Sequence, residues 1–493
     1  QPALAQAFEA GSERKSAVRA KPAEERQASL PDLVRECVRG YTLQTVFARD
    51  LVAAHNDGLL TLTGLDAPLE LAGCATGKPP AGGWTEALID ARAIVGGVAA
   101  VEGLEFGLEA EREPSATRMA RNLILGLRAT RLGLVVNLNI AKPPSWADDL
   151  AAGPLFRDQR RPPDPQRFVA HSDALMQIFL GEEVGSGEAN PGSIEEGGEC
   201  EIGEHCREVR PFLFPSISFP PVRIDWHLSE RDFLPEAGER LLRAARHALT
   251  GAALAFVFDR PRRSIALAEG MDRKNPAVLL VVGLHLPRLL DQPGVRRDPE
   301  LFLKKLGSLA RLALSAGMQK REFLRRHAAG RPTLTREFLL DRARLVAAPV
   351  GLETVVRALS GAGLCEPGGL DLGRRIVERL RQVLHEDGLA SRLFVQLDLP
   401  LSSLGASIDA EGLTSWDATA TVKNQIKTAG ALHAVAGSGT TTLFSPDDEA
   451  PSADQIADWL RWAWVQSDVV RLRCATAAPA ARQLTLRMDQ RAT

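Results

Sequence analysis

Apolar positions repeat with helical spacing in several segments of the chain. Between residues 30 and 56 they recur every three or four positions, which predicts helix, and Asp57-Gly58 interrupts the pattern. The segment 84–105 is rich in Ala, Gly and Val, and we interpret it as one long, closely packed helix. Residues 298–326 have a clear apolar face and a charged face, which predicts an amphipathic helix.

Other segments have the pattern of strands. Residues 59–66 alternate between apolar and polar, and residues 133–144 form an apolar run that ends at Pro143-Pro144. Residues 212–226 form an extended stretch interrupted by prolines, and residues 275–290 have the pattern of a buried strand. Residues 338–363 predict a strand and a helix, and residues 437–472 predict a turn, a strand, a capped helix and a final strand. This alternation predicts an α/β fold.

Composition excludes some classes of function. The 493 residues contain 60 Lys and Arg against 62 Asp and Glu, so the chain lacks the basic excess of a nucleic-acid-binding protein. It contains no run of 18 apolar residues, so we expect no membrane span. Six cysteines are too few for a disulfide scaffold, and the first residues lack the pattern of a signal peptide, so we expect a cytoplasmic protein.

Two segments are too polar for a core. Residues 1–30 are rich in Ala, Glu, Arg and Ser, and we expect a flexible N-terminal tail. Residues 181–208 are rich in Gly and Glu, and we expect a surface insertion. The insertion contains Cys200, His205 and Cys206, which are candidate metal ligands, although their spacing differs from that of structural zinc sites. The alternative is a solvated loop that faces a partner.

Five short motifs follow one another in a recognisable order. They are AHNDGLLTLTGLD at 54–66 with Cys74 shortly after it, FPSISFPPVRIDW at 214–226, VVGLHLPRLL at 281–290, VGLETV at 350–355 and GSGTTTLF at 437–444. Their order resembles that of the catalytic barrel of the anaerobic, class III ribonucleotide reductases, a branch of the glycyl-radical enzymes. The resemblance implies a ten-stranded glycyl-radical-enzyme-like α/β barrel with a helical N-terminal region. The barrel would occupy residues 31–493 as a single domain, with a finger loop through its centre.

The chain also departs from the family pattern. Ser264, Ile265, Ala266 and Leu267 stand where the family carries its finger-loop cysteine. The Asn of a Gly-Leu-Asn-Glu turn is missing at 351–354, and we find neither the radical glycine nor the zinc cysteines that the family carries near its C-terminus. The string CVRGY at 37–41 lies in a helical pattern, and we interpret its likeness to a radical-glycine motif as coincidence. These departures predict a degenerate family member.

Two candidate sites remain. Cys74 matches a family cysteine that faces the substrate, so it is the candidate catalytic residue; the alternative is a small buried apolar residue. Gly437, Ser438, Gly439, Thr440 and Thr441 are candidate phosphate contacts, because small residues let backbone N–H groups approach an anion. The alternative is a tight turn into a strand. The ligand that this motif suggests is a nucleoside triphosphate, and no other cofactor is predicted.

Three functions are compatible with these features. The first is a catalytically inactive, structural, assembly or nucleotide-sensing subunit of a complex. The second is an oxidoreductase of the anaerobic ribonucleoside-triphosphate reductase type, whose radical comes from a separate subunit and whose thiyl is on Cys74 or Cys365. The third is a nucleotide sensor that shifts between oligomers. We expect protein partners or a homo-oligomer, with contacts through the tail, the insertion and Trp464, whereas Trp459 and Trp462 share a face that packs in the core.

Overall fold

The computed structural model describes residues 30–76, 84–105, 123, 132–142, 165–180, 222–249, 254–268, 270–327, 339–399, 420–443 and 451–474. Of the predicted tail, only Leu30 lies within these ranges, where it begins helix α2 (Leu30–Thr45), and α3 (Arg49–Asn56) follows. The predicted insertion at 181–208, with Cys200, His205 and Cys206, lies outside the described residues.

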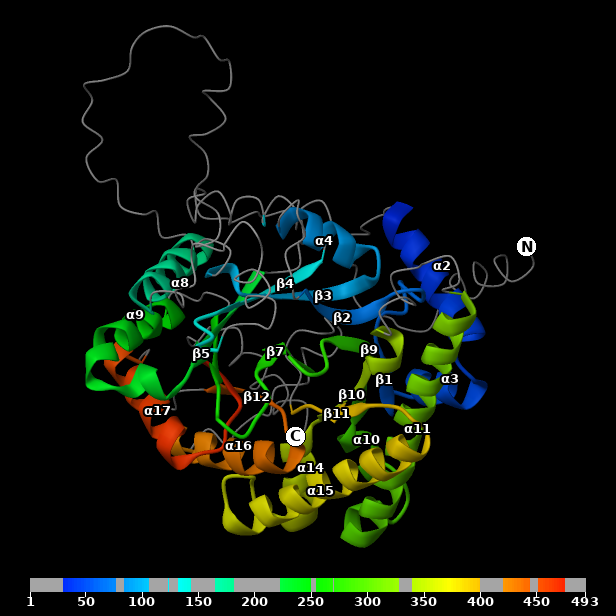
Figure 1. The fold of residues 1–493 in the computed structure, drawn as a ribbon. Helices are drawn as coiled ribbons and strands as arrows, with labels where there is room; N and C mark the ends of the chain where they lie inside the picture. The colour runs from blue at the N-terminus through cyan, green and yellow to red at the C-terminus, as the bar shows by residue number, and fades with distance from the viewer. Residues whose placement is uncertain are drawn as a thin grey trace, which may run out of the picture.

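In the described part of the chain, eleven strands form one sheet around the molecule, and ten of them follow one another in a continuous order (Figure 1). In sheet order they are β11 (Val395–Leu397), β10 (Arg344–Val350), β9 (Ala277–His285), β2 (Leu71–Thr76), β3 (Val95–Glu102), β4 (Gly133–Leu138), β5 (Val222–Leu228), β6 (Leu254–Phe258), β13 (Arg471–Cys474) and β12 (Thr440–Leu443). Strand β1 (Leu60–Leu62) pairs with β9 from outside this order.

The sheet consists of two parallel halves that run in opposite directions. Strands β2 to β6 are parallel to one another, and the junctions β2–β9 and β6–β13 are antiparallel. A parallel bridge between Leu399 and Gly439 connects the two remaining edges, next to β11 and β12. This bridge brings the sheet back to its starting strand, as expected for the predicted ten-stranded barrel.

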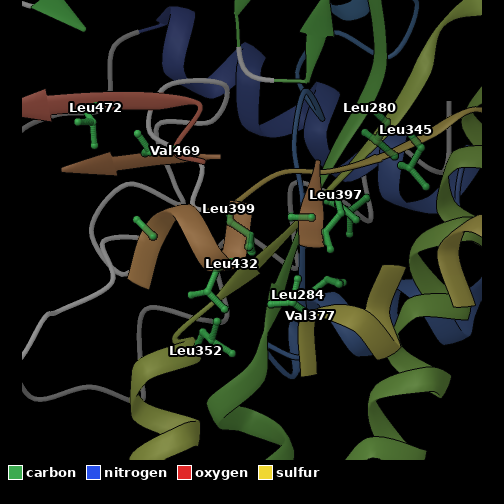
Figure 2. Packing of buried hydrophobic residues seen from close by; sticks show 14 of the residues in the cluster. Leu280, Leu284, Leu345, Leu352, Val377, Leu397, Leu399, Leu432, Val469 and Leu472 are labelled. Atoms are coloured by element: carbon green, nitrogen blue, oxygen red, sulfur yellow. The ribbon is translucent and has the colours of Figure 1, made fainter. Parts of the chain in front are cut away.

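Helices cover the outside of the sheet (Figure 1). They are α4 (Trp84–Arg92), α8 (Pro165–Leu180), α9 (Gly238–Leu249), α10 (Leu286–Leu290), α11 (Pro299–His327), α13 (Leu339–Arg342), α14 (Leu352–Ser360), α15 (Pro367–Ala390), α16 (Val422–Ala436) and α17 (Ala453–Gln466). An aliphatic layer joins them to the strands, and Figure 2 shows part of it: Leu280, Leu284, Leu345, Leu352, Val377, Leu397, Leu399, Leu432, Val469 and Leu472. No helix within the described ranges is long and apolar enough to cross a membrane.

Several predicted elements are confirmed. The buried strand of residues 275–290 is β9 followed by α10, the amphipathic helix of residues 298–326 is α11, and residues 338–363 form β10 and α14. The last predicted segment contains β12, α17 and β13. Ser452 caps α17, because its hydroxyl accepts a hydrogen bond from the backbone N–H of Gln455.

The prediction of one long helix over residues 84–105 is wrong. Helix α4 ends at Arg92, and residues 95–102 form the central strand β3. Both faces of β3 are largely buried, so its apolar run has no alternation that would distinguish it from a packed helix. Gly97 is required here, because a Cβ atom at this position would lie 2.2 Å from the backbone oxygen of Ala72 on the neighbouring strand.

The contact of Trp464 with a partner stays a prediction, and this residue also packs within the chain. Its ring stacks on Phe233 with 5.0 Å between ring centroids, and the Arg260 guanidinium lies 4.9 Å from the Trp464 ring centroid. Arg260 also donates hydrogen bonds to the backbone oxygens of Ala463 and Trp464 at the end of α17. Trp464 therefore packs against Phe233 and Arg260 of the same chain. The Arg260 guanidinium lies over the Trp464 ring while it donates hydrogen bonds to the last carbonyl groups of α17. Trp459 and Trp462 pack against the core as predicted.

A buried lysine lies on the outer layer. Lys320 of α11 donates a hydrogen bond of 2.6 Å to the backbone oxygen of Pro68, and burial lowers its pKa from 10.5 to about 8. The folded state therefore releases this proton at a lower pH than the unfolded chain does, so stability must rise as the pH increases from about 8 to 10.5.

We expect Lys320→Met to remove this pH dependence. The unfolding free energy of the wild type, relative to that of the variant, is expected to rise by about 2 kcal/mol between pH 8 and pH 10. Urea unfolding of both proteins at the two pH values measures this difference. A constant offset between wild type and variant would contradict the prediction.

Candidate functional site in the barrel interior

A short hairpin lies in the barrel interior where the resemblance places the finger loop. Strands β7 (Ala266–Ala268) and β8 (Met271–Asp272) pair with each other, and Figure 1 shows β7 near the centre of the barrel. The hairpin packs against β2, β3 and β4 on one side. Gly270 faces β10 on the other, where a Cβ atom would lie 2.3 Å from Val346 Cγ2. The hairpin therefore fills the space between the two halves of the sheet.

The side chains around this hairpin are aliphatic. Leu267, Ala268 and Met271 belong to a separate interior cluster, to which Ile265 is packed. The cluster is completed by strand and strand-end residues that face inward: Val98, Ala100, Val135, Ile140, Val278, Val281, Val346, Ala348 and Val350. The hairpin side chains Leu267, Ala268 and Met271 are thus packed among apolar side chains.

Cys74 lies in the outer apolar layer between the sheet and the helices, on the other face of the sheet from the hairpin. Its neighbour Gly73 faces Met271 in the interior, whereas Cys74 belongs to the outer core between sheet and helices. Its Sγ lies 3.4 Å from the backbone oxygen of Ala75. The other cysteines within the described ranges are Cys37, Cys365 and Cys474, and none of these four belongs to the interior cluster. Burial raises the pKa of Cys474 to about 12.

Polar side chains form a row next to the apolar layer. Glu102, Asn137 and Asp225 are paired in register across β3, β4 and β5, and all three are buried. Side chains on neighbouring parallel strands at the same register point to the same face, so the row faces the interior. Glu102 and Asn137 lie at the carboxyl ends of β3 and β4, the edge where α/β sheets commonly place their sites.

His227, two residues after Asp225, extends the row. Its Nδ1 lies 2.9 Å from Asp259 Oδ1, and its Nε2 lies 3.0 Å from Asn137 Oδ1. The amide of Asn137 donates to the backbone oxygen of Val101, which leaves its oxygen to face the imidazole. Both ring nitrogens thus lie at hydrogen-bond distance from side-chain oxygens of the chain. This imidazole is held on two sides and has no free nitrogen for a ligand.

Two arginines share one carboxylate beside this row. Arg223 forms a bidentate pair with Asp225, with distances of 2.7 Å (Nε to Oδ1) and 3.1 Å (Nη2 to Oδ2). Arg471 of β13 reaches the same carboxylate, with Nη2 at 3.0 Å from Oδ2. Thr440 of β12 accepts a hydrogen bond of 3.4 Å from Arg471 Nη1. All of these side chains are buried.

Two ion pairs fasten the hairpin to the wall. Arg273 Nε lies 2.8 Å from Glu102 Oε2 on β3, and Arg344 Nη1 of β10 lies 2.7 Å from Asp272 Oδ2. One pair reaches each half of the sheet. The hairpin position is therefore fixed by charge pairing as well as by packing.

The predicted phosphate motif forms the turn that closes the barrel. The backbone N–H of Gly437 donates to His433, and that of Thr440 donates to Leu399, so both are used within the chain. The Ser438 hydroxyl donates a 2.6 Å hydrogen bond to Asp398 Oδ1. Gly439 has no room for a Cβ atom, which would lie 2.3 Å from both the His433 ring and the Leu399 oxygen. Thr441 faces the His433 ring, with Oγ1 at 3.3 Å from Nε2, whereas Thr440 faces Arg471.

His433 is kept neutral at this closure. Burial lowers its pKa from 6.5 to about 3, and its Nδ1 accepts a hydrogen bond from the backbone N–H of Val470. A folded-state pKa below the unfolded value means that the unfolded chain binds the additional proton in acid. Stability must therefore be lost as the pH falls from about 6.5 towards 3.

We expect His433→Gln to flatten this acid dependence. Between pH 7 and pH 4 the wild type is expected to lose on the order of 3 kcal/mol more unfolding free energy than the variant. Denaturant unfolding at the two pH values measures the loss. Equal losses in both proteins would show that His433 is not the titrating group.

A second polar network lies outside the strand ends. Asn139, with φ of +66°, follows β4, and its backbone N–H donates to Glu105 Oε1, which also accepts from Ser172. Its amide nitrogen donates to Asp232, while Arg240 donates to its amide oxygen. Burial raises the pKa of Glu105. This network ties α8 and α9 to the end of β4, a position where Asn tolerates a left-handed backbone.

The fold and the interior hairpin together define a glycyl-radical-enzyme-like α/β barrel. Among solved structures, the chain is similar to the anaerobic ribonucleotide reductase from Thermotoga maritima with citrate in the active site, with a TM-score of 0.63 and 11% sequence identity over 96% of this chain and 94% of that one. The same enzyme with dATP bound in the specificity site gives a TM-score of 0.59 at 10% identity, over 96% of this chain and 87% of that one. Its complex with dATP and CTP gives 0.57 at 11% identity, over 91% and 84%.

Comparison by sequence finds no relative. No protein-family model matches the chain, and no curated protein matches it. The likeness to the solved structures therefore rests on the fold, at a sequence identity of about one residue in ten.

Sequence reasoning missed the polar row and the arginine pair. Asn137 interrupts the apolar strand β4, Asp225 and His227 alternate with apolar residues in β5, and Arg471 begins β13. A charged residue inside a buried strand is costly without a partner, so these interruptions were the available signal. Their partners lie on other strands, far along the chain.

Proposed function

We propose that this chain is a ribonucleotide-reductase-like barrel without thiyl-radical chemistry, which acts as a structural, assembly or nucleotide-sensing subunit of a complex. One observation carries the proposal. The finger hairpin presents Leu267, Ala268 and Met271 to an interior cluster that includes no cysteine of the described residues. A thiyl radical requires a thiol placed against the substrate, and a hydrocarbon side chain cannot supply it.

The nucleotide-sensing part of the proposal rests on the similar structures. Those of the Thermotoga maritima enzyme contain dATP in a specificity site, and dATP with CTP. A barrel of the same fold that has lost its radical chemistry could retain such a ligand, and a ligand that binds the folded state stabilises it.

We expect nucleoside triphosphates to raise the melting temperature of the full chain. A ligand present at about 100 times its Kd adds about 2.7 kcal/mol to the stability. For a cooperative unit of this size, whose unfolding entropy is roughly 1 kcal/mol per K, this corresponds to a rise of about 2 to 3 °C. Thermal unfolding and calorimetry with each ribo- and deoxyribonucleoside triphosphate measure the effect.

Two results separate the parts of the proposal. Binding of one or more nucleotides without ribonucleotide reduction supports a sensor. The absence of binding, together with a chain that stays monomeric and partnerless by native mass spectrometry of its source extract, would contradict both the sensing and the assembly function.

The second candidate is an enzyme whose radical is supplied by a separate subunit. It requires Cys74 or Cys365 to carry the thiyl, and the position of Cys74 in the outer layer makes this the less favoured function. Under this hypothesis, Cys74→Ala/Cys365→Ala abolishes ribonucleotide reduction in a mixture with the radical-bearing subunit and its activase. Unchanged turnover in the double variant would exclude the hypothesis.

A further inference from the structure

A hollow lies at the surface where the chain passes from α10 to α11. Its volume is about 470 Å³, and it is lined by Leu290, Asp291, Gln292, Gly294, Arg296 and Arg297. A cavity of this size can hold a small molecule, and sites for apolar ligands are lined mainly by apolar side chains. Leu290 is the one large apolar side chain in this lining, so the hollow suits a polar ligand.

Successive tight turns fix the backbone of this hollow. The N–H groups of residues 292, 295, 297 and 298 each donate to a carbonyl oxygen three positions earlier. Gly294 has a φ of +81°, a left-handed conformation that glycine adopts without strain. The short 3-10 helix that follows, η4 (Val295–Arg297), therefore presents its two arginines from a defined backbone.

Positive charge exceeds negative charge in this loop. Asp291 is the one acidic residue that lines the hollow, and two arginines share it. Arg296 Nη2 lies 3.3 Å from Asp291 Oδ1, and Arg288 Nη1 lies 3.9 Å from Asp291 Oδ2. The Arg297 side chain makes no ion pair and no hydrogen bond to any residue of the chain that the structure describes. Three guanidinium groups thus accompany one carboxylate.

The start of α11 does not compensate this excess. Asp298 caps the helix, because its Oδ1 accepts hydrogen bonds from the backbone N–H groups of Glu300 and Leu301. Leu301 faces the loop, since a Cβ atom on Gly294 would lie 3.6 Å from Leu301 Cδ2. Lys305 lies one turn further along the same face of α11 and is exposed, so it adds another positive charge on this side.

We propose that this hollow binds the phosphate chain of a small molecule through Arg296 and Arg297. Guanidinium groups match phosphate oxygens in geometry and charge, and adjacent guanidinium groups favour a ligand with several negative charges. The inference deepens the nucleotide-sensing function proposed above, on which its link to nucleotides rests.

Substitutions on the two sides of the charge balance should act in opposite directions. Arg297→Met removes the unpaired guanidinium, so it should weaken the binding of tripolyphosphate at least about tenfold, and Arg296→Met should have a similar effect. Asp291→Asn removes the competing carboxylate, so it should strengthen binding by about threefold or more. Calorimetry on the full chain measures these changes, with potassium chloride at matched ionic strength as the reference. A purely structural loop gives no reason for a gain in affinity.

The exposed ion pair of Arg461 and Asp458 on α17 supplies the matched controls. Arg461→Met and Asp458→Asn make the same changes of charge elsewhere on the surface, and they should leave tripolyphosphate binding unchanged. The side chains substituted in the loop are also exposed, so these variants are expected to fold as the wild type does. Thermal unfolding of each variant verifies this.

The inference is overturned if tripolyphosphate gives no response beyond that of chloride, or if Arg297→Met and Arg296→Met respond as Arg461→Met does. A tighter binding of citrate than of tripolyphosphate would also overturn it, because the site would then select carboxylates. Its failure can be told from that of the proposed function. Nucleotide binding that persists in Arg296→Met/Arg297→Met leaves a sensor without this site. Tripolyphosphate binding that depends on Arg297, with no nucleotide bound, leaves the site without the sensor.

Discussion

Gly439→Ala is expected to destabilise the barrel by about 3 kcal/mol or more, because it adds a Cβ atom at the bridge between Leu399 and Gly439 that joins the two edges of the sheet. A Cβ atom at this position would lie 2.3 Å from the Leu399 oxygen and 2.3 Å from the His433 ring. Neither neighbour is the end of a flexible side chain. The strands must therefore separate, and the hydrogen bond from the Thr440 N–H to Leu399 is expected to weaken with them.

Gly368→Ala is the matched control. Gly368 lies in the first turn of α15 and has no atom within 4 Å of an added Cβ. This substitution is expected to be neutral or to stabilise the fold by about 0.5 kcal/mol, since alanine favours the helix. Denaturant unfolding measures both variants, and hydrogen exchange at residues 440–443 reports the closure directly. If Gly439→Ala resembled Gly368→Ala, the bridge would not contribute to the closure of the barrel.

The elements that could be predicted from the sequence are those whose own residues show a helical or strand-like spacing of apolar positions. Helix α11 has a charged face and an apolar face, and strand β9 is a continuous apolar run, so both could be located from the sequence. Strand β3 was mistaken for helix, because a strand buried on both faces lacks the alternation that identifies it. Closure through Leu399 and Gly439 depends on residues that are 40 positions apart, and the sequence shows only that a turn is present.

The candidate site, too, has one part that could be predicted from the sequence and one part that could not. The interior position of the hairpin could be predicted from the sequence, because the motif order indicated that the segment 264–267 lies in the finger loop. The replacement of a family cysteine by Ile265, Ala266 and Leu267 stays a prediction. The outward direction of Cys74 could not be inferred, because it depends on an irregularity in the pairing of β2 with β3 between Leu71 and Gly73. A shift of one residue in a strand exchanges its two faces, so an assignment of facing from motif position alone is fragile.

The pair of Glu102 and Arg273 supplies the second large expected effect. Glu102→Leu removes the carboxylate that holds Arg273 at 2.8 Å, while the guanidinium stays in the interior, and we expect a loss of about 3 kcal/mol of unfolding free energy. The hairpin loses the ion pair that joins it to β3 within the described part of the chain. Hydrogen exchange at residues 265–272 is therefore expected to increase more than elsewhere in the barrel.

The double variant Glu102→Leu/Arg273→Leu measures how much the ion pair as a whole contributes to the unfolding free energy. The single variant measures instead the loss of stability when only one of the two charges is removed. Replacing both charges with apolar groups of similar length is expected to restore most of the lost stability, because the surrounding interior layer is already aliphatic. Asp341→Leu is the surface control: Asp341 pairs with Arg325 at 2.7 Å, and both side chains are about half exposed, so its loss is expected to change stability by less than about 1 kcal/mol. If Glu102→Leu cost no more than Asp341→Leu, packing alone would hold the hairpin. If the double variant were as unstable as the single one, the charged pair itself would be required for the position of the hairpin.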